Sequence, residues 1–149
     1  MKSQAIQSPT VQPVPRWLVV IAGDEQIALS FDYLLRIIDD AQVYSVPLCG
    51  DYFQGVIYYQ EQAVPVLNWR AISKIQNQGR MFLILKEGAD LVALQINEVK
   101  EILYAQSKEL SDELWCEFDS NRRALKVEKL FTKLRQGSFK AEEQGGENG

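Results

Sequence analysis

The sequence predicts an all-β fold with a few short helices, arranged as two similar small β units within one barrel-like body. Short apolar runs alternate with turns rich in glycine, proline and polar residues, a pattern typical of antiparallel sheets and barrels. The order of buried strand, polar turn and alternating strand also occurs twice along the chain. Helical periodicity is clear only near the C-terminal end, so few helices are expected.

The length of 149 residues suits one domain and is too short for two independent ones. Each β unit would hold about 55 residues, too few to be stable alone, so the units are expected to pack against each other. Residues 1–15 are rich in Pro, Ser, Thr and Gln, and residues 137–149 in Gly and Glu, so a disordered arm and a disordered tail are expected. The folded domain is therefore expected to span residues 16–136.

The first unit begins with residues 17–22, WLVVIA, whose continuous apolar character predicts a buried strand. Residues 23–26 are polar and predict a turn, and residues 27–31 alternate as expected for a strand with one buried face. Residues 32–40, DYLLRIIDD, change period and predict a short helical or irregular turn. A loop containing Pro47 is expected to follow.

The next segment predicts a β-hairpin. Residues 56–59 and 63–69 are apolar runs that flank a polar turn, Gln60-Glu61-Gln62. Pro65 lacks the N–H group that a sheet ladder needs, so its strand is expected at a sheet edge or bulged at that residue. Residues 70–75 predict a short helix.

The second unit repeats the pattern of the first. Residues 81–85 align with the start of the first strand at a spacing of 64, and after one extra residue in the turn, residues 93–103 align with residues 28–38 at a spacing of 65. The alternative is that two unrelated apolar strand–turn–strand segments look alike by chance. The sequence leaves both interpretations open.

A weaker similarity closes each unit. Residues 63–69 resemble residues 124–130, and each stretch reads as a strand that leads into a short helix. Residues 127–135 have apolar side chains at helical spacing, with an acidic residue near the start and basic residues near the end, as the helix dipole favours. This segment is the strongest helix prediction in the chain.

The composition excludes several kinds of chemistry. The chain has no histidine, which excludes Ser-His and Cys-His nucleophiles and imidazole metal ligands. The net charge of −4 argues against nucleic acid as the main partner. No apolar run reaches the roughly 18–20 residues of a membrane span and no secretory signal is seen, so a cytoplasmic protein without direct membrane insertion is expected. Cys49 and Cys116 are expected to be buried thiols, neither a disulfide nor a metal site.

Three features suggest chemistry, and each has a simpler interpretation. Residues 37–40, IIDD, resemble the acidic pair of a phosphorylation receiver domain, but a turn with two solvated carboxylates suits an all-β chain better. Asp90, Glu98 and Lys100 resemble a metal-dependent nuclease motif, which arises often by chance. Residues 121–140 are basic and could bind an anion, although a solvated amphipathic helix explains them as well.

Aromatic and aliphatic side chains are concentrated around the predicted hairpin. Because a strand sends alternate side chains to opposite faces, one core cannot bury all of them. Either both faces are buried between two units, or an apolar patch is exposed for a protein partner. The residues concerned are Tyr52, Phe53, Val56, Ile57, Tyr58, Tyr59 and Trp69.

Two segments resemble the signatures of CheW-like domains. Residues 46–70, VPLCGDYFQGVIYYQEQAVPVLNWR, are similar to the family segment that contains Ile/Val-Pro, Gly-Val and Val-Pro-Val ahead of an Arg. Residues 96–103, INEVKEIL, look like the second and weaker signature. The resemblance implies two SH3-like five-stranded β-barrel subdomains around a shared core, extending over about residues 16–136.

The resemblance also implies a function. CheW-like proteins are non-catalytic adaptors, without cofactors, that couple the cytoplasmic tip of a chemoreceptor, or methyl-accepting chemotaxis protein, to the regulatory domain of a CheA-type histidine kinase. Transferred to this chain, the protein-binding residues are Leu34, Arg36, Ile37, Val56, Tyr58, Tyr59, Gln60 and Glu61. The structural positions are Pro47, Gly55, Pro65 and Trp69.

The chain departs from the family pattern at three docking positions. Gln60 replaces an Arg that the family associates with receptor contact, Glu61 replaces a turn Gly, and Arg36 replaces a Glu. One charge is lost and another reversed, so the receptor partner need not be the usual one, and an array that controls surface motility is one possibility. The alternatives are an SH3-like module for another signalling partner and a small metal-dependent nuclease.

Overall fold

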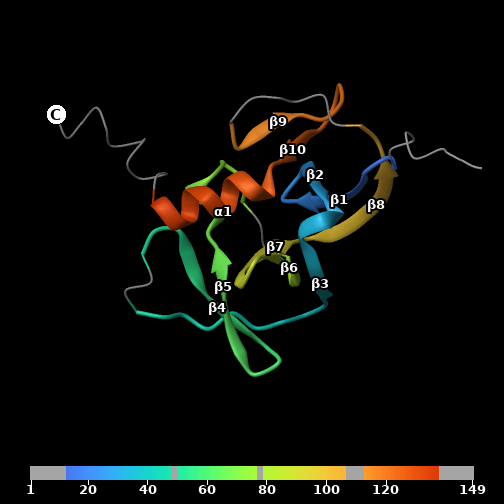
Figure 1. The fold of residues 1–149 in the computed structure, drawn as a ribbon. Coiled ribbons are helices and arrows are strands. Elements are labelled where there is room, and N and C mark those ends of the chain that lie inside the picture. The colour runs from blue at the N-terminus through green and yellow to red at the C-terminus, as the bar shows by residue number, and fades with distance from the viewer. Residues whose placement is uncertain (1–12, 48–49, 77–78, 107–112, 138–149) are drawn as a thin grey trace, which may run out of the picture.

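The computed structural model describes residues 13–47, 50–76, 79–106 and 113–137 (Figure 1). Most of the predicted arm and tail, and Cys49, lie outside the described residues. The described chain forms two five-stranded sheets, short 3-10 turns and one α-helix, which confirms the predicted all-β class with few helices.

The elements follow one another in an order that repeats after the fifth strand. They are β1 (Arg16–Ala22), β2 (Glu25–Ser30), η2 (Phe31–Tyr33), β3 (Leu34–Ile38), β4 (Phe53–Tyr59), β5 (Gln62–Leu67), η3 (Trp69–Ala71), β6 (Met81–Glu87), β7 (Asp90–Ile96), β8 (Glu98–Tyr104), β9 (Trp115–Glu117), β10 (Arg123–Leu125) and α1 (Val127–Gln136).

Each sheet combines strands from both halves of the chain. The first sheet has the order β8-β1-β2-β10-β9 and the second has the order β3-β6-β7-β5-β4. The third, fourth and fifth strands of each unit therefore join the first two strands of the other unit, with β3 pairing with β6 and β8 pairing with β1. We refer to the first sheet as barrel A and the second as barrel B. Because β3 and β8 both cross over, neither barrel can be completed by its own half of the chain.

The strand register shows that the internal repeat is real. Leu18 pairs with Leu29 in the first hairpin, and Leu83 pairs with Leu94 in the second. The same offset relates both pairs, since 83 − 18 and 94 − 29 each equal 65. The predicted spacing of 64 for the first strand is wrong, and the spacing of 65 for the second is right.

The turns explain this correction. Each hairpin turns at two residues and begins with a glycine in the left-handed region, Gly23 with φ of 66° and Gly88 with φ of 63°. Two-residue hairpin turns match the twist of the flanking strands. They require positive φ, a conformation that glycine adopts most easily. The second turn therefore has no extra residue.

The exchanged strands also follow the repeat. β3 skips Leu35 where it pairs with β6, and β8 skips Lys100 where it pairs with β1, so each strand carries its irregularity at the equivalent residue. Arg36 and Glu101 follow these bulges and occupy equivalent positions, because 101 − 36 is also 65. Bulges are specific local features of a strand, so their coincidence supports a true structural repeat.

The segment predicted as a helical or irregular turn, residues 32–40, is mainly a strand. Only Phe31–Tyr33 form a 3-10 turn, which the Ser30 hydroxyl caps by accepting a hydrogen bond from the Asp32 amide at 3.1 Å. Residues Leu34–Ile38 then pair with β6. The partner strand lies nearly fifty residues further on, so local periodicity could not reveal the pairing.

A large core is shared by the barrels, and a smaller core fills each one. No polar or charged side chain is buried among the described residues, so apolar burial is the main stabilising term. The shared core includes Leu18, Val20 and Leu29 from barrel A, Leu83, Leu85 and Leu94 from barrel B, and Leu130 and Phe131 from α1. Barrel B encloses Ile57, Val64, Val66, Phe82, Ile84 and Ala93, and barrel A encloses Trp17, Val19, Ala28 and Ala124.

The similarity predicted between residues 63–69 and residues 124–130 is also present in the structure, but with a different alignment. Val66 pairs in parallel with Ala93, and Ala124 pairs in parallel with Ala28. Because Ala28 and Ala93 are equivalent, Val66 corresponds to Ala124, which lies three residues away from the predicted alignment. The predicted C-terminal helix is confirmed as α1, whereas the short helix predicted after the first unit is only the 3-10 turn η3.

Pro65 lies neither at a sheet edge nor at a bulge, although one of the two was predicted. β5 sits between β7 and β4, and the bulge lies across from it on β4, between Phe53 and Gly55. Pro65 is opposite Val56, whose N–H and C=O groups both bond to the backbone of Tyr44 on the other side. The Pro65 nitrogen therefore faces β7. The parallel ladder between β5 and β7 has a single residue pair, so the missing N–H group of Pro65 removes no hydrogen bond from it.

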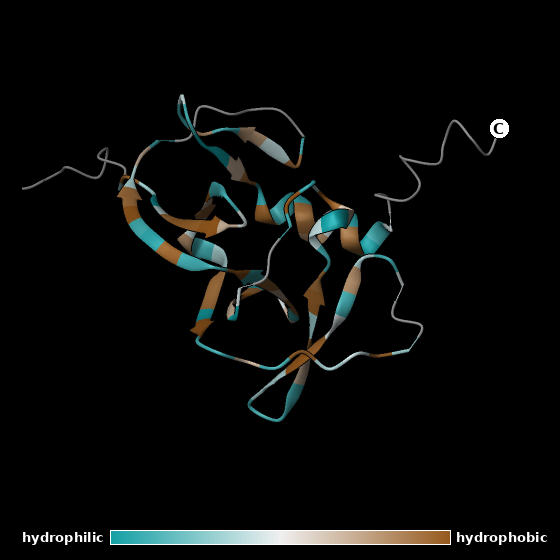
Figure 2. Cartoon of the chain, turned by 180° about the vertical axis from the view of Figure 1, so that it is seen from behind, coloured by the Kyte–Doolittle hydropathy of each residue, from teal (hydrophilic) through white to brown (hydrophobic). Residues whose placement is uncertain are grey.

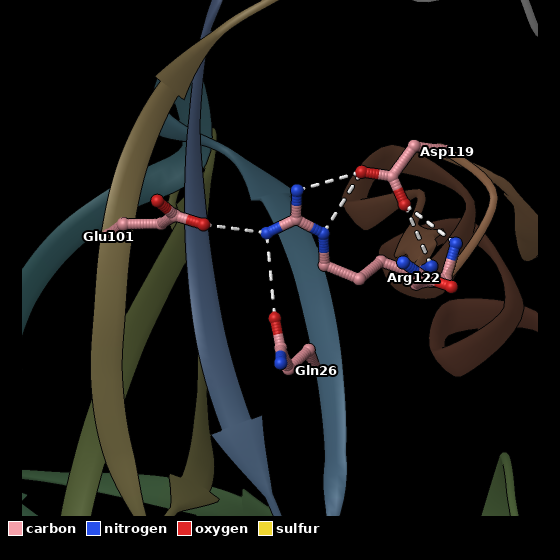
Figure 3. A network of polar contacts seen from close by, with 5 residues as sticks. Gln26, Glu101, Asp119 and Arg122 are labelled. Atoms are coloured by element: carbon pink, nitrogen blue, oxygen red, sulfur yellow. Dashed lines mark hydrogen bonds and ion pairs between the residues drawn. The ribbon is translucent and has the colours of Figure 1, made fainter.

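A polar network joins the two edge regions of barrel A (Figure 3). The Arg122 guanidinium donates to Asp119 at 2.7 Å and 3.0 Å, to Glu101 on β8 at 2.7 Å, and to Gln26 on β2 at 3.5 Å. The hydrogen bond from Arg122 keeps the pKa of Asp119 below its usual value, so the carboxylate stays ionised. The network fastens the β9–β10 connection to the crossing strand β8.

Candidate docking surface

The β4–β5 hairpin projects from the body of the molecule, and its loop end is hydrophilic (Figures 1 and 2). Its inner and outer faces differ in burial. Ile57 is fully buried in the barrel B core and Tyr59 packs against that core from a half-buried position. Tyr58, by contrast, is 61% exposed. The hairpin therefore supplies core on one face and leaves an aromatic side chain in solvent on the other.

The polar turn is shorter than predicted. Gln62 belongs to β5, where it pairs with Tyr59, so only Gln60 and Glu61 form the turn. Both have left-handed backbone angles, with φ of 51° and 64°. Two such residues in a row are typical of a type I′ hairpin turn, which favours glycine or asparagine. The turn is formed here by residues poorly suited to it.

A second aromatic side chain completes an exposed cluster. The ring of Tyr44 meets the ring of Tyr58 edge to face, with centroids 5.5 Å apart. The Tyr44 backbone also exchanges hydrogen bonds of 2.8 Å and 2.9 Å with Val56. Val46, two residues further along the chain than Tyr44, is 38% exposed. We call Tyr44, Val46, Val56 and Tyr58 the hairpin patch.

Gly55 allows the Tyr44 segment to lie against β4. Its φ of 153° is rare for residues with a side chain. A Cβ atom there would lie 2.4 Å from the Tyr44 carbonyl oxygen and 2.9 Å from Val43 Cγ1. The glycine thus permits the close backbone approach that positions Tyr44 beside Tyr58.

The β3 residues predicted to bind proteins separate into different environments. Leu34 is half-buried against the shared core, whereas Ile37 is 40% exposed, as is the neighbouring Leu35. The exposed Arg36 places its guanidinium 5.9 Å from the centre of the Tyr59 ring. The two edges of barrel B, β3 and β4, therefore approach each other at this point.

The positions predicted to be structural also differ. Trp69 is buried, and its indole N–H donates to the Gln95 carbonyl at 2.7 Å, which ties η3 to β7. Pro47 is exposed in the segment that follows Tyr44. Tyr44 was not predicted as a site residue; Val46-Pro47 indicates only that the chain is extended at Val46, and it does not indicate that Tyr44 is exposed.

The residues of the possible nuclease motif are not brought together in one site. Asp90 accepts a hydrogen bond from Arg135 at 2.8 Å, and Arg135 also pairs with Glu87 at 2.7 Å. Glu98 lies on β8 in the other sheet. Within the described ranges no group of carboxylates and thiols is arranged to hold a metal ion.

The acidic pair of residues 37–40 lies at the surface. Asp39 and Asp40 are both exposed, and Asp40 pairs with Arg80 at 2.6 Å. In the part of the chain that the structure describes, no helix has the length and apolar character needed to cross a bilayer.

Comparisons with known proteins give a consistent result. The family model of the CheW-like domain matches residues 16–137. A solved structure with a similar fold is the scaffolding protein TtCheW from Thermoanaerobacter tengcongensis, with a TM-score of 0.59 and 14% sequence identity over 77% of this chain and 88% of that chain. At this identity the likeness establishes the fold alone. A search of curated proteins found no match.

Proposed function

The chain belongs to the CheW-like domain family, and from this premise we propose that it is a non-catalytic adaptor of a bacterial chemosensory complex that binds its partners through the hairpin patch. The observation that carries the proposal is the exposure of paired aromatic rings, with Tyr44 at 47% and Tyr58 at 61%. Exposed apolar clusters that contain tyrosine are typical of protein interfaces.

The rigidity of the patch supports a docking role. The backbone of Tyr44 is bonded to β4, and Ile57 on the opposite face of that strand is fully buried. Side chains held in place before binding lose less conformational entropy when a partner covers them. Binding through the hairpin patch is therefore expected to cost little conformational entropy.

We propose two partners, the cytoplasmic tip of a chemoreceptor and the regulatory domain of a CheA-type histidine kinase, with the complex assembled in the cytoplasm. Family membership supports this choice. In such a complex the adaptor contributes a coupling free energy between the proteins it bridges. This role needs no reacting groups in the adaptor.

The proposal is tested by binding measurements with the purified receptor tip and kinase regulatory domain of the same organism. Replacing Tyr58 by Ala is expected to weaken the binding of at least one of them about tenfold, because an exposed aromatic anchor is lost. Tyr59→Ala should weaken binding too, but it should also lower stability because Tyr59 packs on the core.

The matched control is Tyr104→Ala, which removes a tyrosine that is 65% exposed on β8. Circular dichroism and thermal melting should show that Tyr58→Ala and Tyr104→Ala both remain folded. If wild-type protein binds neither domain, or if Tyr58→Ala binds both as tightly as wild type does, the proposed docking role is wrong.

A further inference from the structure

The two equivalent hairpins, β4–β5 and β9–β10, are held to their barrels in different ways. The strands β4 and β5 have seven and six residues, whereas β9 and β10 have three residues each. β10 meets its other neighbour, β2, at Arg123 and Ala124. The β9–β10 connection, residues 118–122, therefore depends on side-chain contacts more than the β4–β5 turn does.

Side chains fasten this connection to the body of barrel A. Arg122, which is 16% exposed, donates to Glu101 on β8 at 2.7 Å (Figure 3). The ring of Phe118 lies 5.2 Å from the ring of Trp17 on β1. Asp119 belongs to the connection itself and accepts from Arg122 at 2.7 Å, so it holds the guanidinium in place for Glu101.

The apolar interior beneath the connection is small. Trp17 is 8% exposed, and its indole N–H donates to the Ala105 carbonyl at 2.9 Å. Leu103 on β8 is paired with Trp17 and packs against the same core. Because this core is the smallest of the three in the described part of the chain, little apolar burial opposes its local opening.

The base of the β9–β10 hairpin, by contrast, is anchored firmly. The Trp115 indole N–H donates to the Ile72 carbonyl at 2.8 Å, and Leu125 is buried in the shared core. Arg123 lies over the Trp115 ring, 3.7 Å from its centre, and also pairs with Glu25. An opening of the connection is therefore expected to end at Arg123 and to leave the shared core intact.

We propose that the β9–β10 connection is a flap that opens locally from barrel A, and that the ion pair between Arg122 and Glu101 keeps it closed. Opening separates Phe118 from Trp17, which exposes an apolar surface that the closed state covers. This motion concerns the protein by itself, so it goes beyond the adaptor function and does not depend on which partners bind.

Electrostatics make Arg122 the controlling residue. Its guanidinium lies between the carboxylates of Glu101 and Asp119, so it joins the body of the barrel to the connection. Without that positive charge the two carboxylates would be left close together and would repel each other. A neutral residue at position 122 therefore removes the attraction that closes the flap and adds a repulsion that opens it.

Hydrogen exchange of the tryptophan indoles, followed by nuclear magnetic resonance on the full-length protein, tests this motion. The Trp17 indole is expected to exchange at least about tenfold faster than the indole of Trp69, a shared-core residue that donates to the Gln95 carbonyl at 2.7 Å. Arg122→Gln should raise the Trp17 rate by about a further tenfold, because charge-assisted hydrogen bonds are lost, and should leave the Trp69 rate unchanged.

A second variant and a matched control sharpen the test. Glu101→Gln weakens the attachment to β8 but keeps the charge of Arg122, so it should raise the Trp17 rate by less than Arg122→Gln does. Arg80→Gln makes the same change in charge as Arg122→Gln, but at an exposed ion pair with Asp40, and it should leave both indole rates unchanged.

Equal exchange of the Trp17 and Trp69 indoles in the wild-type protein would show that barrel A opens only when the whole molecule unfolds, and the flap would be refuted. The same conclusion follows if Arg122→Gln changes both rates equally or changes neither, or if Arg80→Gln raises the Trp17 rate as much. Should Arg122→Gln fail to fold, Glu101→Gln decides, and an unchanged Trp17 rate in that variant would overturn the role of the ion pair.

Discussion

Gly55 shows how a single residue shapes the candidate surface. The Tyr44 carbonyl approaches so closely that no side chain fits at position 55, and the φ of 153° adds strain for any other residue. The hydrogen bonds between Tyr44 and Val56 depend on this approach. The position of Tyr44 in the hairpin patch therefore depends on a residue that no partner need touch.

Gly55→Ala is expected to lower the free energy of unfolding by about 2–4 kcal/mol, and Gly55→Val by more, because both the clash and the backbone strain must be relieved. Chemical denaturation measures the change. Gly88→Ala is the control, since Gly88 has φ of 63° but nothing within 4 Å of its missing Cβ, and it should cost only about 1 kcal/mol. Equal losses for the two alanine variants would show that the close approach is unimportant.

Some residues could be assigned from the sequence and others could not. Gly55 and Trp69 stand in a recognisable signature, and the structure gives each a steric or hydrogen-bonding reason. Tyr44 could not be assigned, because its exposure depends on a backbone pairing twelve residues away at Val56. The environment of Arg36 depends on Tyr59, which lies at the opposite edge of the same sheet.

At the scale of elements, the β4–β5 hairpin combines a well-packed base with a strained turn. Buried Ile57, Val64 and Val66 anchor its strands in barrel B. Gln60 and Glu61 occupy left-handed conformations that cost residues with side chains about 1–2 kcal/mol each. The base thus holds the turn in a conformation that its own residues disfavour.

Glu61→Gly is therefore expected to stabilise the protein by about 0.5–1 kcal/mol, because relief of strain exceeds the added flexibility of the unfolded chain. The melting temperature should rise by a few degrees. Gln62→Gly is the control, since Gln62 is a strand residue and glycine there should be destabilising. A fall in stability for Glu61→Gly as large as that for Gln62→Gly would contradict the assigned turn.

Crossing strands are the elements that local sequence patterns describe least well. Residues 17–22 are continuously apolar and residues 127–135 have a clear helical periodicity, and both form the predicted elements. Residues Leu34–Ile38 have no such pattern. Their pairing partner, β6, belongs to the other half of the chain, so the local sequence does not reveal the strand. The exchange of β3 and β8 follows from long-range pairing, which composition and spacing do not encode.

At the scale of the whole molecule, two equivalent units are joined by exchanged strands and a shared core. The repeat could be detected from the sequence, but its register at the first strand could not, because that alignment depends on the length of a turn. The Arg122 network joins the edge regions of barrel A, whereas the β4–β5 hairpin projects from barrel B. The symmetric framework therefore presents an asymmetric surface.

The central claim, that the hairpin patch is a docking surface held by the paired barrels, is tested most directly by nuclear magnetic resonance. Labelled protein would be titrated with the unlabelled receptor tip and, separately, with the unlabelled kinase regulatory domain. The account predicts that for at least one of them the largest amide shifts fall at Tyr44, Val56 and Tyr58, with small shifts along α1. Shifts concentrated on α1 or on the β9–β10 connection, with Tyr44 and Tyr58 unchanged, would contradict it.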